Sequence, residues 1–348
     1  MDIYNRVKRK ISYGLYLVLI SSFAIASLSG CGEDTGSTPV LNAQSSSGPK
    51  EADTPNGTTT TKASEDAAPA ERVKGSRDNT PVCLVPEASG ETVYENEYAH
   101  LDASNASDGY VVVRYTGESP KVKLQITGPN TITYTYNLTT GNPTDEVFPL
   151  QSGNGDYMIN VFENIEGTQY SQAFSQLVTV ELTDEFSPFL YPNQYVDFKA
   201  SDEAVKKGAD LAYVCNTDLE VVSEVYNFMI TNIVYDHEEA ETVQSGYIPD
   251  VDEVLATKTG ICLDYAALMT TMLRSQRIPT RMEIGYAGTA YHAWLSTYIQ
   301  DVGWVNGMIE FDGTDWSLMD PTFASNMKDS SLKEFIGDGS NYSVKYIY

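Results

Sequence analysis

Hydrophobic and polar positions follow two different periods along this chain. Between residues 110 and 182, short runs such as 121–126 and 131–136 alternate between apolar and polar side chains, and turn sequences such as Gly-Pro-Asn at 128–130 separate them. A period of two predicts half-buried β-strands. Strands of this length and spacing are typical of an antiparallel, immunoglobulin-like β-sandwich, which we place at residues 81–190.

Beyond residue 195 the apolar residues recur at helical spacing. Helices are predicted over about 202–213, after Asp218, and from Asp250 to about 255, whereas the polar and acidic residues 236–249 are expected to form a loop. A further helix should begin near residue 262, because five apolar residues share one face of it. They are Tyr265, Leu268, Met269, Met272 and Leu273.

Alternation returns after this helix, which Pro279 prevents from continuing. Strands are predicted over 291–298 and 304–311, and over 316–319. The predicted fold class is therefore α+β, with the sandwich followed by a second domain at residues 195–345.

The first thirty residues have the composition of a targeting segment. A basic stretch at 6–10 precedes a mostly apolar stretch at 11–28, in the order of a secretory signal peptide. The segment ends in Leu-Ser-Gly-Cys at 28–31, which resembles a bacterial lipobox and implies cleavage before Cys31 and lipid on its thiol. We expect an extracytoplasmic protein that this lipid anchors to the cell membrane. The alternative is an uncleaved single-span anchor.

The next segment, residues 31–80, is predicted to be a disordered tether. It is rich in Ser, Thr, Pro, Gly, Ala and Glu and contains no aromatic residue. Such a composition cannot bury enough apolar surface to offset chain entropy. A coil of this length has an end-to-end distance of roughly 40 Å, enough to lift the folded part off a membrane.

The formal net charge of the chain is −26. A surface this acidic repels phosphate backbones, so a nucleic-acid partner is disfavoured. No CxxC or HExxH spacing occurs, and neither a metal site nor a cofactor is expected. If Cys31 carries lipid, three cysteines remain. Cys83 and Cys215 either form a disulfide or are both reduced and buried, and Cys262 is the free thiol in the first case.

Cys262 has the setting of a nucleophile. It opens the predicted helix directly after Gly260 and Ile261. The positive end of a helix stabilises thiolate over thiol, and the N–H groups of the first turn can stabilise an oxyanion. The alternative is a buried structural cysteine. Asp264, in the same turn, is expected to interact with the helix dipole rather than to react.

A nucleophilic cysteine needs a base, which in turn needs an orienting acceptor. His292 lies on a predicted strand and shares a face with Trp294, whose indole can shield the imidazole. Pro321 keeps Asp320 extended at the end of a later strand, where its carboxylate can accept the imidazole N–H. The alternatives are that His292 is a core histidine with satisfied hydrogen bonds, and that Asp320 is only a turn or cap residue before Pro321. His100 and His237 are expected on the sandwich surface and in the acidic loop.

Three motifs in order carry a resemblance to the transglutaminase-like superfamily. They are Gly-x-Cys-x-Asp-Tyr-Ala at 260–266, His-Ala-Trp at 292–294 and Asp-Pro-Thr at 320–322. The resemblance covers about residues 215–325. It implies a papain-like core and a catalytic triad in which Cys262 is the nucleophile, His292 the general base and then acid, and Asp320 the residue that orients His292.

The activity that the resemblance implies is acyl transfer from amide bonds through a thioester. Release by water makes the protein a peptidase or amidase, and release by an amine makes it a cross-linking transglutaminase. We favour hydrolysis because water always competes. A non-catalytic surface scaffold or adhesin that keeps the fold is the other alternative. Surface proteins or cell-wall peptides are the expected substrates, and the sandwich is expected to act as a spacer or to present them.

Overall fold

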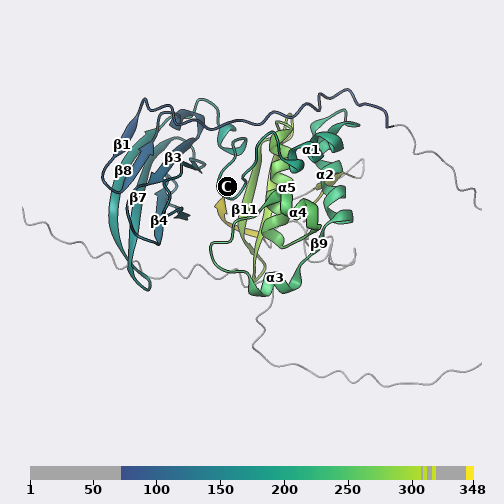
Figure 1. The fold of residues 1–348 in the computed structure, drawn as a ribbon. Coiled ribbons are helices and arrows are strands. Elements are labelled where there is room, and N and C mark those ends of the chain that lie inside the picture. Colours follow the sequence, from purple (N-terminus) through teal and green to yellow (C-terminus); the bar gives the residue numbers. More distant parts are fainter. Residues whose placement is uncertain (1–71, 307–308, 312–315, 319–341) are drawn as a thin grey trace, which may run out of the picture.

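The structure, a computed structural model, describes residues 72–306, 309–311, 316–318 and 342–348. The predicted signal peptide, Cys31, most of the predicted tether and Asp320 lie outside the described residues. Figure 1 shows a mostly β part beside a part with helices and a sheet. No helix in the described part of the chain combines the length and apolarity needed to cross a membrane.

The N-terminal part consists of two four-stranded antiparallel sheets, with strand orders β1-β2-β3-β6 and β5-β4-β7-β8. The first contains β1 (Val93–Glu95), β2 (Ala99–Asp102), β3 (Tyr110–Tyr115) and β6 (Glu146–Pro149). The second contains β4 (Val122–Thr127), β5 (Thr133–Leu138), β7 (Gly155–Glu166) and β8 (Gln169–Val180). Two 3-10 turns, η1 (Ala106–Asp108) and η2 (Ser187–Phe189), flank strands of this part.

The core of this part forms from alternate residues, as the pattern predicts. Along β4, Val122, Leu124 and Ile126 are buried, whereas the residues between them are half-buried. Leu101 and Val113, from the other sheet, are buried in the same hydrophobic cluster. The antiparallel architecture predicted from the period of two is therefore confirmed. Strands β1, β2 and β6 escaped prediction because each has only three or four residues.

The C-terminal part contains helices on one side of an antiparallel sheet. The helices are α1 (Glu203–Ala212), α2 (Asp218–Asn232), α3 (His237–Thr242), α4 (Val251–Thr257) and α5 (Cys262–Ser275). The sheet has the order β13-β12-β11-β16, from β11 (Thr280–Ala287), β12 (Ala290–Ile299), β13 (Gly303–Asn306) and β16 (Tyr342–Ile347). The C-terminal part also contains two separate two-stranded sheets. One pairs β9 (Val234–Tyr235) with β10 (Thr259–Gly260) in parallel, and the other pairs β14 (Ile309–Phe311) with β15 (Trp316–Leu318) antiparallel.

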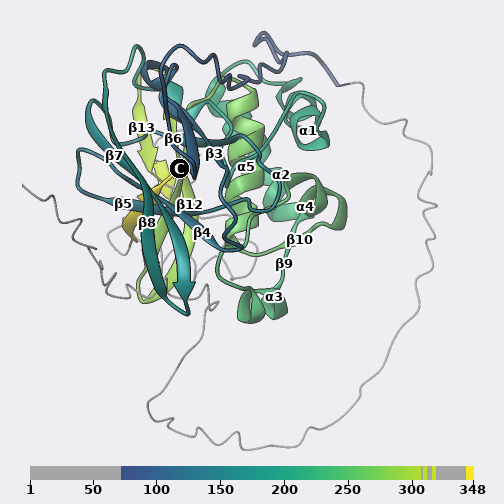
Figure 2. The ribbon, with the colours of Figure 1, turned by 60° about the vertical axis from the view of Figure 1, so that its left-hand side comes forward.

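Helix α5 lies between the sheet and the other helices, with β11 on one side and α1, α2 and α4 on the other (Figures 1 and 2). Every residue of α5 is buried. The sequence predicted one apolar face, but the polar Thr270, Thr271 and Ser275 are buried as well. The close approach of α1 explains part of this burial, because a Cβ at Gly208 would lie 3.0 Å from the carbonyl oxygen of Met272.

Two other expectations differ from the structure. The predicted acidic loop begins with helix α3, because the Asp236 carboxylate accepts from the Glu239 N–H at 2.8 Å and caps the first turn. The predicted tether reaches residue 80, but residues 72–80 lie along the C-terminal part without forming a helix or strand (Figure 1). There Arg77 Nε donates to Asp218 Oδ1 at 2.6 Å, and the Gly75 N–H donates to the Tyr213 carbonyl at 2.9 Å.

The described cysteines Cys83, Cys215 and Cys262 are all free thiols. Of the two alternatives for Cys83 and Cys215, the structure therefore has the reduced one. Cys215 is buried, and its Sγ lies 3.6 Å from the carbonyl oxygen of Leu211 in a weak hydrogen bond. A Cβ at Gly75 would lie 2.0 Å from the Cys215 carbonyl oxygen, so the extended N-terminal segment packs directly over it.

Candidate active site

The turn that carries Cys262 joins a short strand to the central helix. Strand β10 ends at Gly260, Ile261 is extended with φ −92° and ψ 179°, and Cys262 is the first residue of α5. The thiol-bearing residue is 6% exposed. N–H groups of a first helical turn have no partner within the helix, so this turn offers donors to an anion that forms on an attacked carbonyl.

Asp264 holds this turn in place. Its Oδ2 accepts from the Ile261 N–H at 2.8 Å, and its Oδ1 accepts from the Tyr247 hydroxyl at 2.8 Å. Asp264 is 1% exposed. A Cβ at position 260 would lie 2.7 Å from the Asp264 Cβ, so only glycine at 260 leaves room for this carboxylate. The sequence indicated a dipole partner at Asp264, and the structure adds two specific hydrogen bonds.

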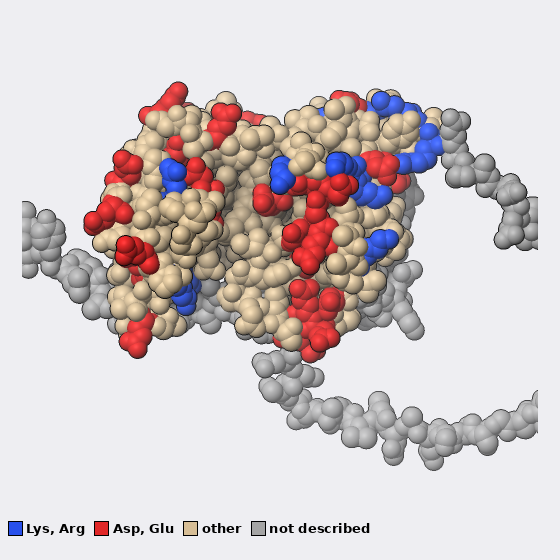
Figure 3. Space-filling view, viewed as in Figure 1, with Lys and Arg blue, Asp and Glu red and all other residues tan. Residues whose placement is uncertain are grey.

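Burial raises the pKa of Asp264 to about 6, against the lowering effect of the Ile261 and Tyr247 hydrogen bonds. The nearby Glu239 and Glu253 raise it further. Figure 3 shows acidic side chains gathered on this face of the molecule, in the region of α3 and α4. The turn with Cys262 therefore lies in a locally negative environment, which sequence composition indicated only for the chain as a whole.

Tyr247 is a residue that sequence reasoning missed. It lies 17 residues before Asp264, in the segment between α3 and α4, and no sequence pattern connects the two. Burial of the ring raises the pKa of Tyr247, and the charge of Asp264 and the hydrogen bond to it raise this pKa further, so the hydroxyl remains a donor at neutral pH. Only the fold brings this donor to the start of α5.

His292 lies on β12 and is 1% exposed. Its ring stacks on the Trp294 indole, with centroids 6.1 Å apart and an interplanar angle of 21°. The alternation along this strand predicts that contact. Gly285 lies opposite His292 in the sheet, and a Cβ there would lie 3.0 Å from the Trp294 ring. The absence of a side chain at Gly285 therefore leaves space for the indole beside His292.

A buried carboxylate supports the Trp294 indole. Glu283 lies opposite Trp294 in the sheet, is 5% exposed and accepts a hydrogen bond from the indole and another from the Ser296 hydroxyl at 2.9 Å. Burial raises the pKa of Glu283 despite these two bonds. Glu283 thus fixes the ring that covers one side of the His292 imidazole. Sequence analysis did not single out Glu283.

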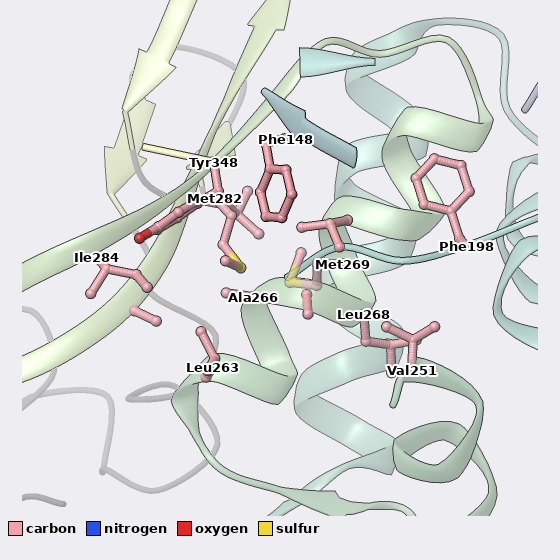
Figure 4. Packing of buried hydrophobic residues seen from close by; sticks show 14 of the residues in the cluster. Phe148, Phe198, Val251, Leu263, Ala266, Leu268, Met269, Met282, Ile284 and Tyr348 are labelled. Atoms are coloured by element: carbon pink, nitrogen blue, oxygen red, sulfur yellow. The ribbon is translucent and has the colours of Figure 1, made fainter. Parts of the chain in front are cut away.

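Helix α5 packs on the sheet that contains His292. Met282 and Ile284 of β11 point toward Ala266 and Met269 of α5 (Figure 4). Because side chains alternate along a strand, His292 is on the face of β12 opposite to the one that continues this packing. Its neighbour Tyr291 lies within electrostatic reach of Cys262, which adds slightly to the effect of burial in raising the pKa of Tyr291.

The third predicted residue, Asp320, lies outside the described residues, and its role stays a prediction. The last described residue before it is Leu318, which ends β15. His100 and His237 are placed apart from this site. His100 Nδ1 forms a hydrogen bond with Glu95 Oε2 at 3.0 Å in the sandwich, and His237 opens α3 with its ring against Tyr235. Among the described residues, no group of three or more His, Cys, Asp or Glu side chains is arranged to hold a metal ion.

Solved structures of low identity resemble parts of the chain. One is named "Putative Cysteine Protease", from Cytophaga hutchinsonii, with 18% identity over 66% of this chain and 79% of that chain, at a TM-score of 0.32. The periplasmic domain of TgpA from Pseudomonas aeruginosa has 15% identity over 70% of this chain and 78% of that one, at 0.30. Red sea bream transglutaminase has 14% identity over 61% and 48%, at 0.23. No curated protein matches the chain significantly.

The sequence profile of one family also matches the chain. It is the profile of the transglutaminase-like superfamily, and it matches residues 208–307. This range begins in α1, contains the whole of α2 to α5, β11 and β12, and includes both Cys262 and His292. Residues 208–307 therefore form a transglutaminase-like domain.

Proposed function

We propose that this chain is a surface-anchored cysteine enzyme that cleaves amide bonds of proteins or cell-wall peptides through a thioester. Cys262 is the nucleophile, His292 the general base and acid, and Asp320 the residue that orients His292. One observation carries the proposal above all. Cys262 opens the buried central helix after a fixed strand-to-helix turn, inside the part of the chain that matches the transglutaminase-like superfamily.

The chemistry follows from that position. For this step the His292 imidazole must reach Cys262 from the face of β12 opposite to the α5 packing. The Cys262 thiol then gives its proton to His292, and the thiolate sulfur attacks the amide carbonyl carbon. N–H groups at the start of α5 stabilise the oxyanion of the tetrahedral intermediate. His292 returns the proton to the amide nitrogen, the C–N bond breaks, and the amine leaves. The acyl group is then held on the sulfur as a thioester.

Release of the acyl group completes the cycle. His292 takes a proton from water, and the oxygen attacks the thioester carbonyl. The C–S bond then breaks to release a carboxylic acid, and His292 returns the proton to the sulfur, which restores the free thiol. A primary amine at the same step would give a new amide instead. We assign hydrolysis, because water is always present at the thioester and an amine needs a site of its own.

The place of action is part of the proposal. Cys31, at the end of the lipobox-like sequence, would carry the lipid, and the following segment would connect it to the part of the chain that the structure describes. Substrates then lie outside the cytoplasmic membrane. The variant Cys31→Ser tests this: in cell fractionation it should move the protein from the membrane fraction to the soluble secreted fraction. Unchanged membrane association would point to an uncleaved span.

The enzymatic proposal is tested by mass spectrometry of the products. The full chain is incubated with a glutamine-containing peptide and a primary amine, in parallel with the Cys262→Ala variant. Hydrolysis gives a shortened or deamidated peptide, and transamidation gives an amine adduct. Either product must be absent with Cys262→Ala. An adduct would replace hydrolysis by cross-linking, and identical results for both proteins with peptide and cell-wall substrates would support a non-catalytic scaffold.

A further inference from the structure

The segment between α3 and α4 contacts both the β-sandwich and the turn that carries Cys262. At Gly246, with φ +90°, an added Cβ would lie 2.5 Å from Asn137 Nδ2 of β5. The next residue, Tyr247, donates to Asp264 Oδ1 at 2.8 Å. Two consecutive residues therefore approach two different parts of the molecule. Figure 1 shows the loop that leaves α3 extending toward the sandwich.

Asp264 links Tyr247 to the backbone next to Cys262. The second oxygen of Asp264 accepts from the Ile261 N–H at 2.8 Å, and Ile261 directly precedes Cys262. Both carboxylate oxygens are thus used, one by the segment between α3 and α4 and one by the backbone of the turn. A displacement of Tyr247 would act on Asp264 and, through it, on the peptide group next to the thiol.

Capping alone does not explain this arrangement. Asp250 caps α4 by accepting from the N–H groups of Asp252 and Glu253, and it remains exposed. Asp264 serves a comparable purpose at the start of α5 but is 1% exposed. Burial of a carboxylate is costly unless its hydrogen bonds are satisfied. The Tyr247 hydroxyl supplies the second of these bonds, from a segment that has contacts elsewhere.

We propose that Tyr247 and Asp264 are positioning residues for Cys262, and that they connect the nucleophile to the surface of the β-sandwich that Gly246 contacts. This rests on the proposed role of Cys262 and gives the sandwich a role beyond that of a spacer. A ligand or substrate that shifts the sandwich against the segment 243–249 changes the orientation of the Cys262 turn. The sandwich then contributes to the control of thiol reactivity.

The first test measures the rate at which iodoacetamide alkylates Cys262, resolved by peptide mass spectrometry. Tyr247→Phe removes one hydroxyl and should slow this alkylation about tenfold, the equivalent of one hydrogen bond to a charged group. Tyr94→Phe, in the sandwich, is the matched control and should leave the rate unchanged. An unchanged or faster rate in Tyr247→Phe would overturn the proposal, whatever the variant does to the melting temperature.

The second test asks whether the two residues act as a unit. Asp264→Asn can keep both hydrogen bonds, because its carbonyl accepts from Ile261 and its amide donates to Tyr247. It should therefore retain most of the alkylation rate that Asp264→Ala loses. Adding Tyr247→Phe to Asp264→Ala should lower the rate no further. Additive losses in the double variant would show that Tyr247 acts by another route.

The third test addresses the sandwich. Gly246→Ala places a Cβ against Asn137 and strains a positive φ, whereas Gly141→Ala strains a similar φ of +80° with no atom within 4 Å. Only Gly246→Ala should slow alkylation, and only when Tyr247 is present. Equal rates in the two glycine variants would remove the sandwich from the proposal.

Alkylation needs no substrate, so the two proposals can fail separately. A reactive Cys262 that the variants do not affect ends the positioning proposal and leaves the enzyme standing. Variants that slow alkylation while no amide product forms end the enzymatic proposal and leave positioning standing. A wild-type Cys262 that iodoacetamide does not alkylate ends both.

Discussion

The guanidinium of Arg274 donates to the carbonyl oxygen of Tyr348 at 2.7 Å, which joins the last turn of α5 to the end of the β16 segment. The same side chain donates to the carbonyl of Tyr191 at 2.7 Å and twice to that of Thr280, at 3.0 and 2.8 Å. Arg274 is 1% exposed, and burial lowers its pKa to about 9, so it remains charged at neutral pH.

Arg274→Met should therefore be strongly destabilising. It removes four hydrogen bonds and leaves the carbonyl groups of Tyr191, Thr280 and Tyr348 without their charged donor. We expect a loss of about 3–5 kcal/mol in the free energy of unfolding. Urea denaturation followed by circular dichroism measures this loss. Arg114→Met is the control, because Arg114 makes an exposed ion pair with Asp145 at 3.4 Å, worth under about 1 kcal/mol. Equal losses in both variants would contradict a structural role for Arg274.

Sequence patterns predicted the elements that are long and regular. Runs of β-branched, aromatic or alternating residues located β3, β4, β5, β7 and β8, and the helical period located α5 with its start at Cys262. In each case a local pattern within a single element was enough to locate it. In the N-terminal part, β1, β2 and β6 have too few residues to show an alternation of apolar and polar positions.

Contacts between distant segments could not be predicted in this way. Nothing in the sequence near Tyr247 indicates that its hydroxyl reaches Asp264, and nothing near Arg274 identifies Tyr191 as a partner 83 residues away. The packing of residues 72–80 along the C-terminal part was missed for a related reason. A polar composition predicts disorder, but here Arg77 has a specific partner in Asp218, which its own sequence segment does not reveal.

The buried Asp264 should make stability depend on pH in a defined direction. Its pKa is raised from 3.8 to about 6, so between these values the folded chain holds a proton that the unfolded chain has lost. The stability that Asp264 contributes is thus fully present below pH 3.8 and is lost as the pH rises through about 6. The gap corresponds to about 3 kcal/mol.

Asp264→Asn does not titrate and should lack this loss. The free energy of unfolding of the variant, relative to wild type, should therefore increase by about 2 kcal/mol from pH 4 to pH 7. Chemical denaturation across this range measures the difference, and Asp156→Asn on the sandwich surface is the control. If the difference in the free energy of unfolding between Asp264→Asn and wild type stayed constant with pH, the pKa of Asp264 would be the same in the folded and unfolded chain.

Cys262 should be alkylated before the other two described cysteines. Burial raises the pKa of Cys215 to about 11, with Glu224 and Glu220 adding to the effect, and burial also raises the pKa of Cys83. Both are therefore almost fully protonated at neutral pH, and thiols react as thiolates. Time-resolved peptide mapping after iodoacetamide treatment should show the modified Cys262 peptide first. Cys83 is only half-buried, and its earlier modification would show that access rather than ionisation controls reactivity.

His292→Gln tests the base directly. If His292 accepts the thiol proton, the variant should lose about 10²–10⁴-fold in turnover of an amide substrate and should alkylate more slowly at neutral pH. His237→Gln and His100→Gln make the same substitution at an exposed helix start and at a hydrogen bond in the sandwich, and both should keep wild-type rates. Because His292 is on the face of β12 away from the Met282 and Ile284 packing, this comparison is decisive: equal rates in all three variants would mean that the imidazole does not reach Cys262.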